Sequence, residues 1–416
     1  MTKSEATHAK GPVFVVGSPR SGTSILTWCL GQHPNILPLE ESGWMGRLAI
    51  DLGVGYRAGS QFGPRSQLSA LGVDRDAYFE AFGKTIDAII HQHRGQLERN
   101  CKRSAAPNLA AVESPFSISR SSADPKSRWV DGTPEYSFHI CGLRKLFPNA
   151  KFVHIVRDVR LVVNSMLHFK QRGVSGLFET EQQAYEYWSN TVEACVRAEH
   201  ALGSEIIHRL RYDDLVHQPE QALRNLLAFL DEPYASACVE PLAQRINSSD
   251  VPAGFQARDA STDARVVERA LRLSDQLQVP CEYYRPTPSA RVEFEAGFNK
   301  QVAFAAELDT EYASAQRKVT ALGKRLSLCG IMVVANVVFA AGATLLEEAH
   351  RPGWSRLWLA LSLVGLGIYA VIRRAGLMQL LARVGKRLKL RSTTPNVGDG
   401  YPYDAHRVSR KSGAGV

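Results

Sequence analysis

The chain contains few cysteines, and no two of them form a recognisable pair. Its seven cysteines stand singly among 416 residues, without a CxxC spacing or a His/Cys pattern typical of metal ligands. Because structural zinc and iron–sulfur sites need such clusters, we expect no metal site. Scattered single cysteines are also typical of proteins kept in a reducing compartment.

The first residues lack the apolar run of a secretory signal, since MTKSEATHAKGP is largely polar. We therefore expect the folded part of the chain to stay in the cytoplasm. The formal net charge is +9 and the pI is about 9.2. This balance suits nucleotides, nucleic acid or an anionic membrane surface. The motifs described below favour a nucleotide, and we expect no nucleic-acid partner.

Short β-branched runs alternate with helical patterns through the first part of the chain. Three units are expected: strand 13–16 with helix 21–30, strand 151–156 with helix 159–169, and a strand from Ile206 with a helix that opens at Pro219. Strands that alternate with helices predict a parallel α/β sheet flanked by helices, as in P-loop NTPases. The polar region 45–128 between the first two units is expected to hold insertions that cap an active site.

Two apolar stretches near the C-terminus predict a transmembrane helical hairpin. Residues 328–346 carry no charge, and 354–372 repeat the pattern after the turn EEAHRPG. Each stretch is about the length that crosses a bilayer. Basic residues flank both outer ends and glutamates occupy the turn, so both ends should face the cytoplasm. Two buried helices of a soluble domain are the alternative.

The expected organisation is a catalytic domain over 1–300, a helical linker over 301–326, the hairpin over 327–373 and a basic cytoplasmic tail over 374–416. The protein would then be a multi-pass protein of the cytoplasmic membrane. Small residues such as Gly330, Ala335 and Gly342 leave open whether the hairpin packs internally or forms a homo-oligomer.

The loop after the first predicted strand is rich in hydrogen-bond donors. It keeps the glycines and the terminal hydroxyl of a P-loop but has threonine where a nucleotide hydrolase has lysine. Backbone N–H groups of a Gly-rich turn that opens a helix converge on an anion, and arginine and hydroxyl side chains add donors. The loop is therefore expected to bind a terminal phosphate through Ser18, Pro19, Arg20, Ser21, Gly22, Thr23 and Ser24.

A second anion-binding pattern follows the predicted strand 151–156. Arg157 stands at the carboxyl end of this strand, and Ser165 follows eight positions later, about two turns along the next helix. Both side chains can approach one anion from the crevice at this edge of the sheet. No acidic Mg²⁺ ligand is evident, which disfavours ordinary ATP or GTP chemistry.

GSPRSGTS and HIVRDVRLVVNS together resemble the 5′-phosphosulfate loop and the 3′-phosphate motif of sulfotransferases that use 3′-phosphoadenosine 5′-phosphosulfate (PAPS). The likeness extends over roughly residues 11–250 and is greatest to protein-tyrosine, Golgi-type and bacterial sulfotransferases. It implies that the sulfuryl group of PAPS passes directly to an acceptor hydroxyl without a metal. The cytoplasmic topology and scattered cysteines point to a bacterial protein.

The resemblance also assigns residues around the transferred group. Glu41 is the first choice for the base that takes the acceptor proton, Glu40 is its competitor, and Arg20 would offset charge on the bridging oxygen. Tyr212 resembles the aromatic residue beside the nucleotide, and Ser249 would contact the 3′-phosphate.

One position departs from the family pattern. Many relatives have a lysine just before Thr-Pro, where this chain has Gly132. Arg128, Lys126 or the backbone is expected to take the place of that cation; the alternative is that the loop only shapes the pocket. His33 is interpreted as a structural histidine at the end of the first helix.

The predicted function is sulfuryl transfer from PAPS to a small-molecule or lipid acceptor held near the membrane by the hairpin. Two alternatives remain open: a P-loop kinase that uses ATP, and a non-catalytic nucleotide-binding membrane adaptor. A kinase would need lysine at position 23, and an adaptor would bind adenosine 3′,5′-bisphosphate without turnover.

Overall fold

The computed structural model describes residues 10–104, 123–171, 174–175, 177–243, 259–278 and 285–347. The chain divides into two compact units, Met1–Glu307 and Leu308–Val416. The first unit contains the sheet and every described residue that the sequence assigned to the site.

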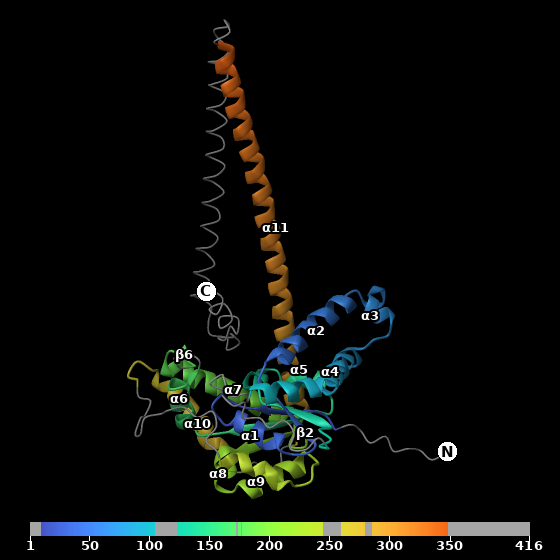
Figure 1. Cartoon of the computed structure of the whole chain (residues 1–416), viewed down its shortest axis with the longest axis vertical. Helices are drawn as coiled ribbons and strands as arrows, with labels where there is room; N and C mark the ends of the chain where they lie inside the picture. Colours follow the sequence, from blue (N-terminus) through green and yellow to red (C-terminus); the bar gives the residue numbers. More distant parts are fainter. Residues whose placement is uncertain are drawn as a thin grey trace, which may run out of the picture. The chain divides into compact units, whose positions relative to one another are not determined.

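Five parallel strands form the central sheet, in the order β2-β3-β1-β4-β7 (Figure 1). The strands are β1 (Val13–Val16), β2 (Ile36–Leu39), β3 (Arg128–Asp131), β4 (Lys151–Val156) and β7 (Ile207–Arg211). The expected α/β class with a parallel sheet is confirmed. Strands β1, β4 and β7 match the three predicted runs, whereas β2 and β3 were not predicted. A separate antiparallel pair joins β5 (Lys170–Gln171) to β6 (Val174–Ser175).

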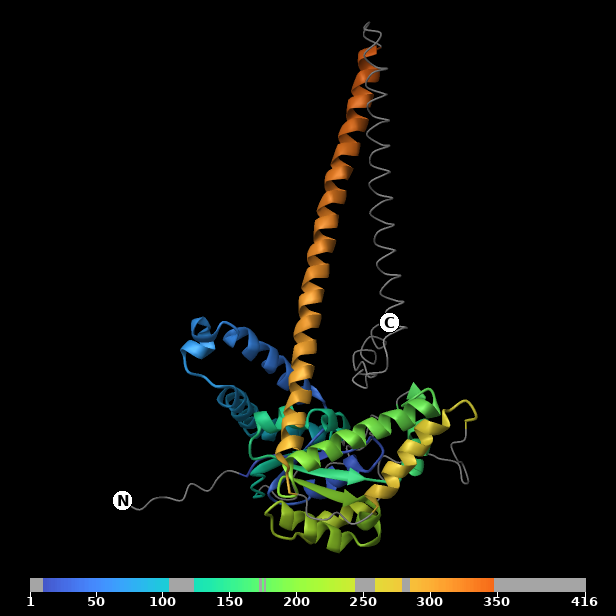
Figure 2. The same ribbon diagram turned by 180° about the vertical axis from the view of Figure 1, so that it is seen from behind.

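Side chains of β1 alternate between two apolar layers, as a strand buried on both faces requires. Phe14 and Val16 belong to the layer under α2, α5 and α7, while Val13 and Val15 belong to the layer under α1, α8 and α9. Figure 2 shows the sheet between these layers. The ring of Phe14 contacts four aromatic rings at centroid distances of 5.4–5.9 Å, those of Trp129, Tyr136, Phe147 and Phe152.

The helices that flank the sheet follow the strands in the expected alternation. Their bounds are α1 (Thr23–Gly31), α5 (Ile140–Leu146), α6 (Val159–Leu167), α7 (Glu181–Leu202), α8 (Tyr212–His217), α9 (Pro219–Phe229) and α10 (Ala264–Leu277), with the 3-10 helices η2 (Pro134–Phe138) and η3 (Ser236–Ala243). Proline opens α9 as predicted, because the first helical N–H has no partner inside the helix.

The described part of the region between β2 and β3 is largely helical. It contains α2 (Trp44–Ser60), η1 (Gly63–Arg65), α3 (Gln67–Ala70) and α4 (Arg75–Ser104). Helix α2 begins three residues after Glu41, so the insertion starts beside the predicted base. Met45 and Ala49 of α2 are fully buried against the sheet layer that contains Phe14.

Helix α11 runs from Pro288 to Glu347 and therefore begins before the predicted linker. Its first turns belong to the first unit, where Phe298 and Val302 are buried. Within the described residues, no helix is long and apolar enough to cross a membrane. The second predicted span and the basic tail lie outside the described residues, as do most side chains of the first span. The hairpin stays a prediction.

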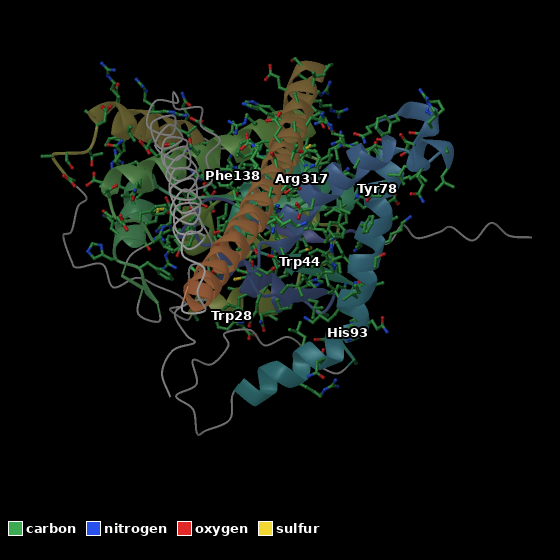
Figure 3. The ribbon with its side chains drawn as sticks, turned by 90° about the horizontal axis from the view of Figure 1, so that it is seen from above. Trp28, Trp44, Tyr78, His93, Phe138 and Arg317 are labelled. Atoms are coloured by element: carbon green, nitrogen blue, oxygen red, sulfur yellow. The ribbon has the colours of Figure 1, made fainter. Side chains whose placement is uncertain are left out.

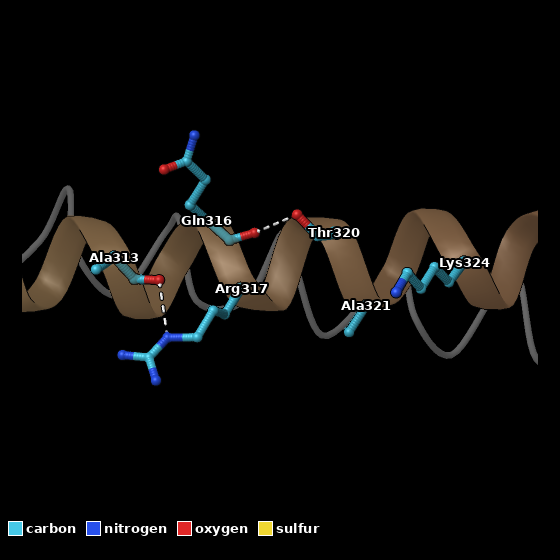
Figure 4. A pocket seen from close by; sticks show the side chains of 6 residues that line it. All are labelled: Ala313, Gln316, Arg317, Thr320, Ala321 and Lys324. Atoms are coloured by element: carbon cyan, nitrogen blue, oxygen red, sulfur yellow. Dashed lines mark hydrogen bonds between the residues drawn. The ribbon is translucent and has the colours of Figure 1, made fainter.

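A cavity of about 500 Å³ lies along α11 in the second unit (Figure 4). It is lined by Ala313, Gln316, Arg317, Thr320, Ala321 and Lys324. Two of its polar side chains bond to carbonyls of their own helix: Arg317 Nε donates to Ala313 at 3.3 Å, and Thr320 Oγ1 donates to Gln316 at 2.9 Å. These six residues contribute no carboxylate or imidazole for acid–base chemistry.

Candidate active site

The Gly-rich loop joins the carboxyl end of β1 to α1. Gly22, the residue before α1, has φ 106°, a value that favours glycine. A Cβ at Gly22 would also lie 2.6 Å from Cδ2 of Tyr212, so glycine is needed for this close approach. At the start of the loop, the N–H of Gly17 donates to Ser137 Oγ at 2.9 Å. The loop is thus anchored at both ends.

The middle of this loop leaves a buried donor without a protein partner. Ser21 is 1% exposed, and its hydroxyl has no hydrogen-bond partner in the described part of the chain. Buried polar atoms are normally satisfied, and exceptions mark sites for water, ions or ligands. The N-terminus of α1 adds free N–H groups at the same place. The loop therefore has the chemistry of an anion-binding cradle.

Arg157 lies at the carboxyl end of β4 and contacts the loop directly. One of its terminal nitrogens donates to the carbonyl of Arg20 at 3.2 Å, and its guanidinium stacks 4.4 Å from the ring centre of Tyr212. Its Nε is buried and has no partner among the described residues. Arg157 thus keeps a donor available while two contacts fix its orientation.

Arg20 bridges the two predicted anion sites. Its Nε donates to Ser165 Oγ on α6 at 3.1 Å, and its guanidinium lies 4.3 Å from the ring centre of Phe169. The backbone of Arg20 is left-handed, with φ 69°, a strained conformation for a side chain of this size. The structure therefore brings together four predicted residues, namely Arg20, Arg157, Ser165 and Tyr212.

Electrostatics at this position favour an anion. The pKa of Arg20 is lowered to about 10, mainly by burial and next by the positive charge of Arg157, while the charge of Glu41 opposes this shift. Two guanidinium groups that repel each other are stabilised when a phosphate or sulfate binds between or beside them.

Glu41 lies in the loop after β2 and is tied to the Gly-rich loop. Ser24 Oγ donates to Glu41 Oε1 at 2.7 Å. The pKa of Glu41 is raised, mainly because its carboxyl group is desolvated; the Ser24 hydrogen bond lowers it, and the charge of Glu135 raises it. Glu40 and Glu41 are both accessible to solvent, but no hydrogen bond or ion pair of Glu40 is present among the described residues. The hydrogen bond to the Gly-rich loop thus favours Glu41 over Glu40 as the base.

The loop after β3 leaves no room for the family lysine. A Cβ at Gly132 would lie 2.0 Å from Thr27 Oγ1, which donates to the carbonyl of Thr23 at 2.9 Å. The next residue, Thr133, donates to Asp131 Oδ1 through its N–H at 3.0 Å and its hydroxyl at 2.6 Å. Burial raises the pKa of Asp131 to about 7. Only glycine fits position 132 beside Thr27.

Neither suggested substitute for that lysine faces the site. Lys126 Nζ donates to three backbone carbonyls at 2.9 Å, those of Gly31, His33 and Ile36. Arg128 donates to the carbonyls of Gly11 and Leu230 and pairs with Glu232. The interpretation of either side chain as a transition-state cation is wrong, because both side chains donate to carbonyl groups or pair with a carboxylate elsewhere in the fold.

His33 has the structural role that the sequence indicated. Its Nδ1 accepts from the N–H of Asn35 at 3.1 Å, and its Nε2 lies 2.9 Å from the carbonyl of Pro233. This pair of bonds assigns a neutral imidazole with the proton on Nε2. Burial lowers the pKa of His33, in agreement with the neutral form.

Three residues at the site were not found from the sequence: Ser137, Phe169 and Glu135. Each acts through a contact between segments far apart in the chain, so no local pattern marks it. Ser249 and its neighbours lie outside the described residues.

The site combines a Gly-rich loop that lacks the P-loop lysine, a second cationic group on the neighbouring strand and a carboxylate bonded to the loop. This combination is typical of group-transfer proteins. A family model described as "Sulfotransferase family" matches residues 12–236, more than half of the chain. The chain belongs to the sulfotransferase family. This membership argues against the ATP kinase alternative.

Curated relatives include protein-tyrosine sulfotransferases. Protein-tyrosine sulfotransferase A of Caenorhabditis elegans is 24% identical over 222 residues, which are 53% of this chain and 50% of that protein. Protein-tyrosine sulfotransferase 1 of Homo sapiens is 27% identical over 233 residues, which are 56% of this chain and 54% of that protein. The chain thus spans about half the length of these relatives.

Among solved structures, the sulfotransferase domain of the curacin biosynthetic pathway is similar over 67% of this chain and 99% of that domain, at 18% identity and a TM-score of 0.36. A mouse sulfotransferase in complex with PAP is similar over 73% of this chain and 89% of that chain, at 15% identity and a TM-score of 0.27.

Proposed function

We propose that this protein transfers the sulfuryl group of PAPS to an acceptor hydroxyl, with Glu41 as the base. The observation that carries this proposal is a pair of buried donors that have no partner among the described residues, Ser21 Oγ and Arg157 Nε, one in each motif. Both lie where the family binds phosphate, and both suit an anion with two separate phosphate groups. Family membership supports the reaction class.

The residues of the Gly-rich loop would hold the 5′-phosphosulfate through backbone N–H groups and the Ser21 hydroxyl. Arg157 and Ser165 would hold the 3′-phosphate, and Tyr212 would lie beside the nucleotide. PAPS, when bound, supplies an activated sulfuryl group and a stable leaving group. The described residues fit this donor, because unfilled N–H and O–H donors and two arginines face one site.

The chain's own part in the transfer is proton removal and charge stabilisation. The acceptor oxygen forms a bond to sulfur, the bond from sulfur to the phosphate oxygen breaks, and the electron pair leaves with adenosine 3′,5′-bisphosphate. Glu41 takes the acceptor proton, and Ser24 holds Glu41 Oε1 by a 2.7 Å hydrogen bond. Arg20 offsets the charge on the leaving oxygen.

We further propose that the acceptor is a small molecule or a membrane-associated product such as a lipid or glycolipid. Two apolar stretches of about membrane-spanning length in the sequence, at 328–346 and 354–372, support this part. Attachment to a bilayer would raise the effective concentration of the site near lipid headgroups.

The test measures radiolabelled sulfate transferred from PAPS to a lipid extract and, in parallel, the affinity for adenosine 3′,5′-bisphosphate by calorimetry. Wild type should bind the nucleotide and label a product, and Arg20→Ala should lose most of both. Arg224→Ala is the matched control, because Arg224 is an exposed arginine on α9 that pairs with Glu220. Absence of nucleotide binding by wild type would overturn the proposal, and binding without turnover on any acceptor would support the adaptor.

A further inference from the structure

Two loops are joined beside the predicted base. The N–H of Ser42 donates to Thr133 Oγ1 at 2.9 Å, and the N–H of Met45 donates to the hydroxyl of Tyr136 at 3.4 Å. Ser42 directly follows Glu41, and Glu135 stands two residues after Thr133. These cross-links hold Glu135 in the neighbourhood of Glu41.

Glu135 is a second carboxylate at the same place, and it is electrostatically coupled to the first. Its negative charge raises the pKa of Glu41, and partial burial raises its own pKa. In the described structure Glu135 forms no ion pair, a backbone hydrogen bond at Glu135 itself partly opposes the rise of its pKa, and the residue is partly accessible to solvent. A half-buried carboxylate that is not paired with a cation makes the local potential more negative.

Nearby arginines offset this potential only in part. The charge of Arg20 lowers the pKa of Glu41 but is the smallest of its causes, and no arginine is among the causes that shift the pKa of Glu135. Arg20 and Arg157 are hydrogen-bonded to Ser165 and to the carbonyl of Arg20, respectively, rather than to these carboxylates. Arg47, on the first turns of α2, directs its Nε to both carboxylate oxygens of Asp51, at 3.0 and 3.1 Å. The acceptor side of the site therefore carries Glu40, Glu41 and Glu135 with no described cation bound to any of them.

We propose that Glu135 determines acceptor specificity by favouring acceptors that bring a positive charge beside the reacting hydroxyl, and by disfavouring anionic ones. This inference rests on the proposed sulfuryl transfer and adds the charge class of its acceptor. An amine on the acceptor would supply the cation that Glu135 lacks. A carboxylate on the acceptor would meet like charges and bind more weakly.

Trp44 adds an aromatic surface at this end of the site. It is the first residue of α2, three positions after Glu41, and its side chain is 48% exposed (Figure 3). Aromatic rings attract both planar groups and ammonium ions. A phenol that carries an amine is therefore a fitting probe for this part of the molecule.

The experiment uses three phenols of similar size that differ in charge: tyramine, 4-ethylphenol and 3-(4-hydroxyphenyl)propionate. Their affinities are measured by calorimetry for the full chain saturated with adenosine 3′,5′-bisphosphate. Wild type should bind tyramine about tenfold more tightly than the propionate. In Glu135→Gln this preference should shrink to about twofold, while affinity for 4-ethylphenol stays the same, since one charge at this range contributes roughly 1 kcal/mol.

The control is Glu220→Gln, the same chemical change at an exposed glutamate on α9. It should keep the wild-type order. Tyramine that does not bind, or that binds no more tightly than the propionate, would overturn the inference. So would a preference that survives Glu135→Gln. Failure of adenosine 3′,5′-bisphosphate to bind in the same titration would instead overturn the proposed function.

Discussion

Two pairs of cations lie near the sheet, and their surroundings differ. Lys126 and Arg128 are almost completely buried, and the ammonium of Lys126 donates to three carbonyls, which is all that its three protons allow. Arg157, at the carboxyl end of β4, keeps a buried Nε without a described partner, and its neighbour Arg20 is destabilised by the charge of Arg157.

The number of unfilled hydrogen-bond donors distinguishes cations with a structural role from cations that are available to bind a ligand. Saturated donors stabilise the fold, because their removal would leave buried carbonyls unsatisfied. Unfilled donors and like-charge repulsion cost stability, and proteins keep such features where a ligand removes the cost. Burial alone therefore does not identify a functional arginine or lysine; the number of donors left unfilled does.

The largest expected effect is on the rate of sulfuryl transfer, and it concerns Glu41, the proposed base beside Arg20 and Arg157. Glu41→Gln keeps the size of the side chain and its contact with Ser24 but cannot take a proton. We expect sulfuryl transfer to fall by about 10³-fold, within the range for general bases, while nucleotide affinity stays near wild type. Glu40→Gln is the matched control and should change the rate less than about threefold. Equal losses in both variants would contradict the assignment of Glu41.

The next prediction concerns Lys126, whose ammonium group has a carbonyl acceptor for each of its three protons. Lys126→Met removes the ammonium but keeps an unbranched side chain of similar length, and leaves three buried carbonyls without their donor. We expect the free energy of unfolding to fall by about 3 kcal/mol. Urea denaturation measures the change. Nucleotide affinity, corrected for the folded fraction, should remain unchanged, and a loss of affinity at full folding would contradict the structural role.

Arg157, whose Nε has no described partner, should affect nucleotide affinity rather than the free energy of unfolding. Arg157→Gln removes the charge that faces the proposed 3′-phosphate, and we expect affinity for adenosine 3′,5′-bisphosphate to fall about thirtyfold, or about 2 kcal/mol. Relief of repulsion with Arg20 should leave the free energy of unfolding unchanged or slightly higher. Calorimetry and urea denaturation on one preparation separate the two quantities. If Arg157→Gln lowered the free energy of unfolding but left nucleotide affinity unchanged, Arg157 would be a structural cation like Lys126.

A smaller effect appears in the pH dependence of transfer. Glu41 acts as a carboxylate, and its folded pKa is raised above that of a free glutamate. Activity should therefore fall on the acid side at a pH above the usual glutamate range, as Glu41 becomes protonated. Glu135→Gln removes a charge that raises this pKa, so the acid limb should move to lower pH. A profile of kcat/KM against pH checks both statements, and an unmoved limb would exclude the coupling.

The grouping of the proposed phosphate-binding residues was predictable from sequence, because their signals are local. The Gly-rich turn follows β1 directly, and Arg157 and Ser165 stand on one strand end and the following helix. The structure brings both motifs to one edge of the sheet, since parallel strands end on the same side.

The acceptor half could not be predicted in the same way. Strand β2 is a four-residue edge strand that contains Pro38, and β3 begins with Arg128 and ends with Asp131, so neither shows a typical strand pattern. The proximity of Glu135 to Glu41 depends on the hydrogen bond from Ser42 to Thr133. The structural role of Lys126 and Arg128 likewise depends on carbonyl groups that lie far from them in the sequence.

The close contact at Gly132 has a consequence for how this site can change over evolutionary time. The family's lysine cannot enter position 132 while Thr27 keeps its present position, because its Cβ would meet Thr27 Oγ1 at 2.0 Å. Movement or replacement of Thr27 would in turn disturb a hydrogen bond inside α1. The contact couples the two positions, so a substitution at one of them changes which side chains the other can accept.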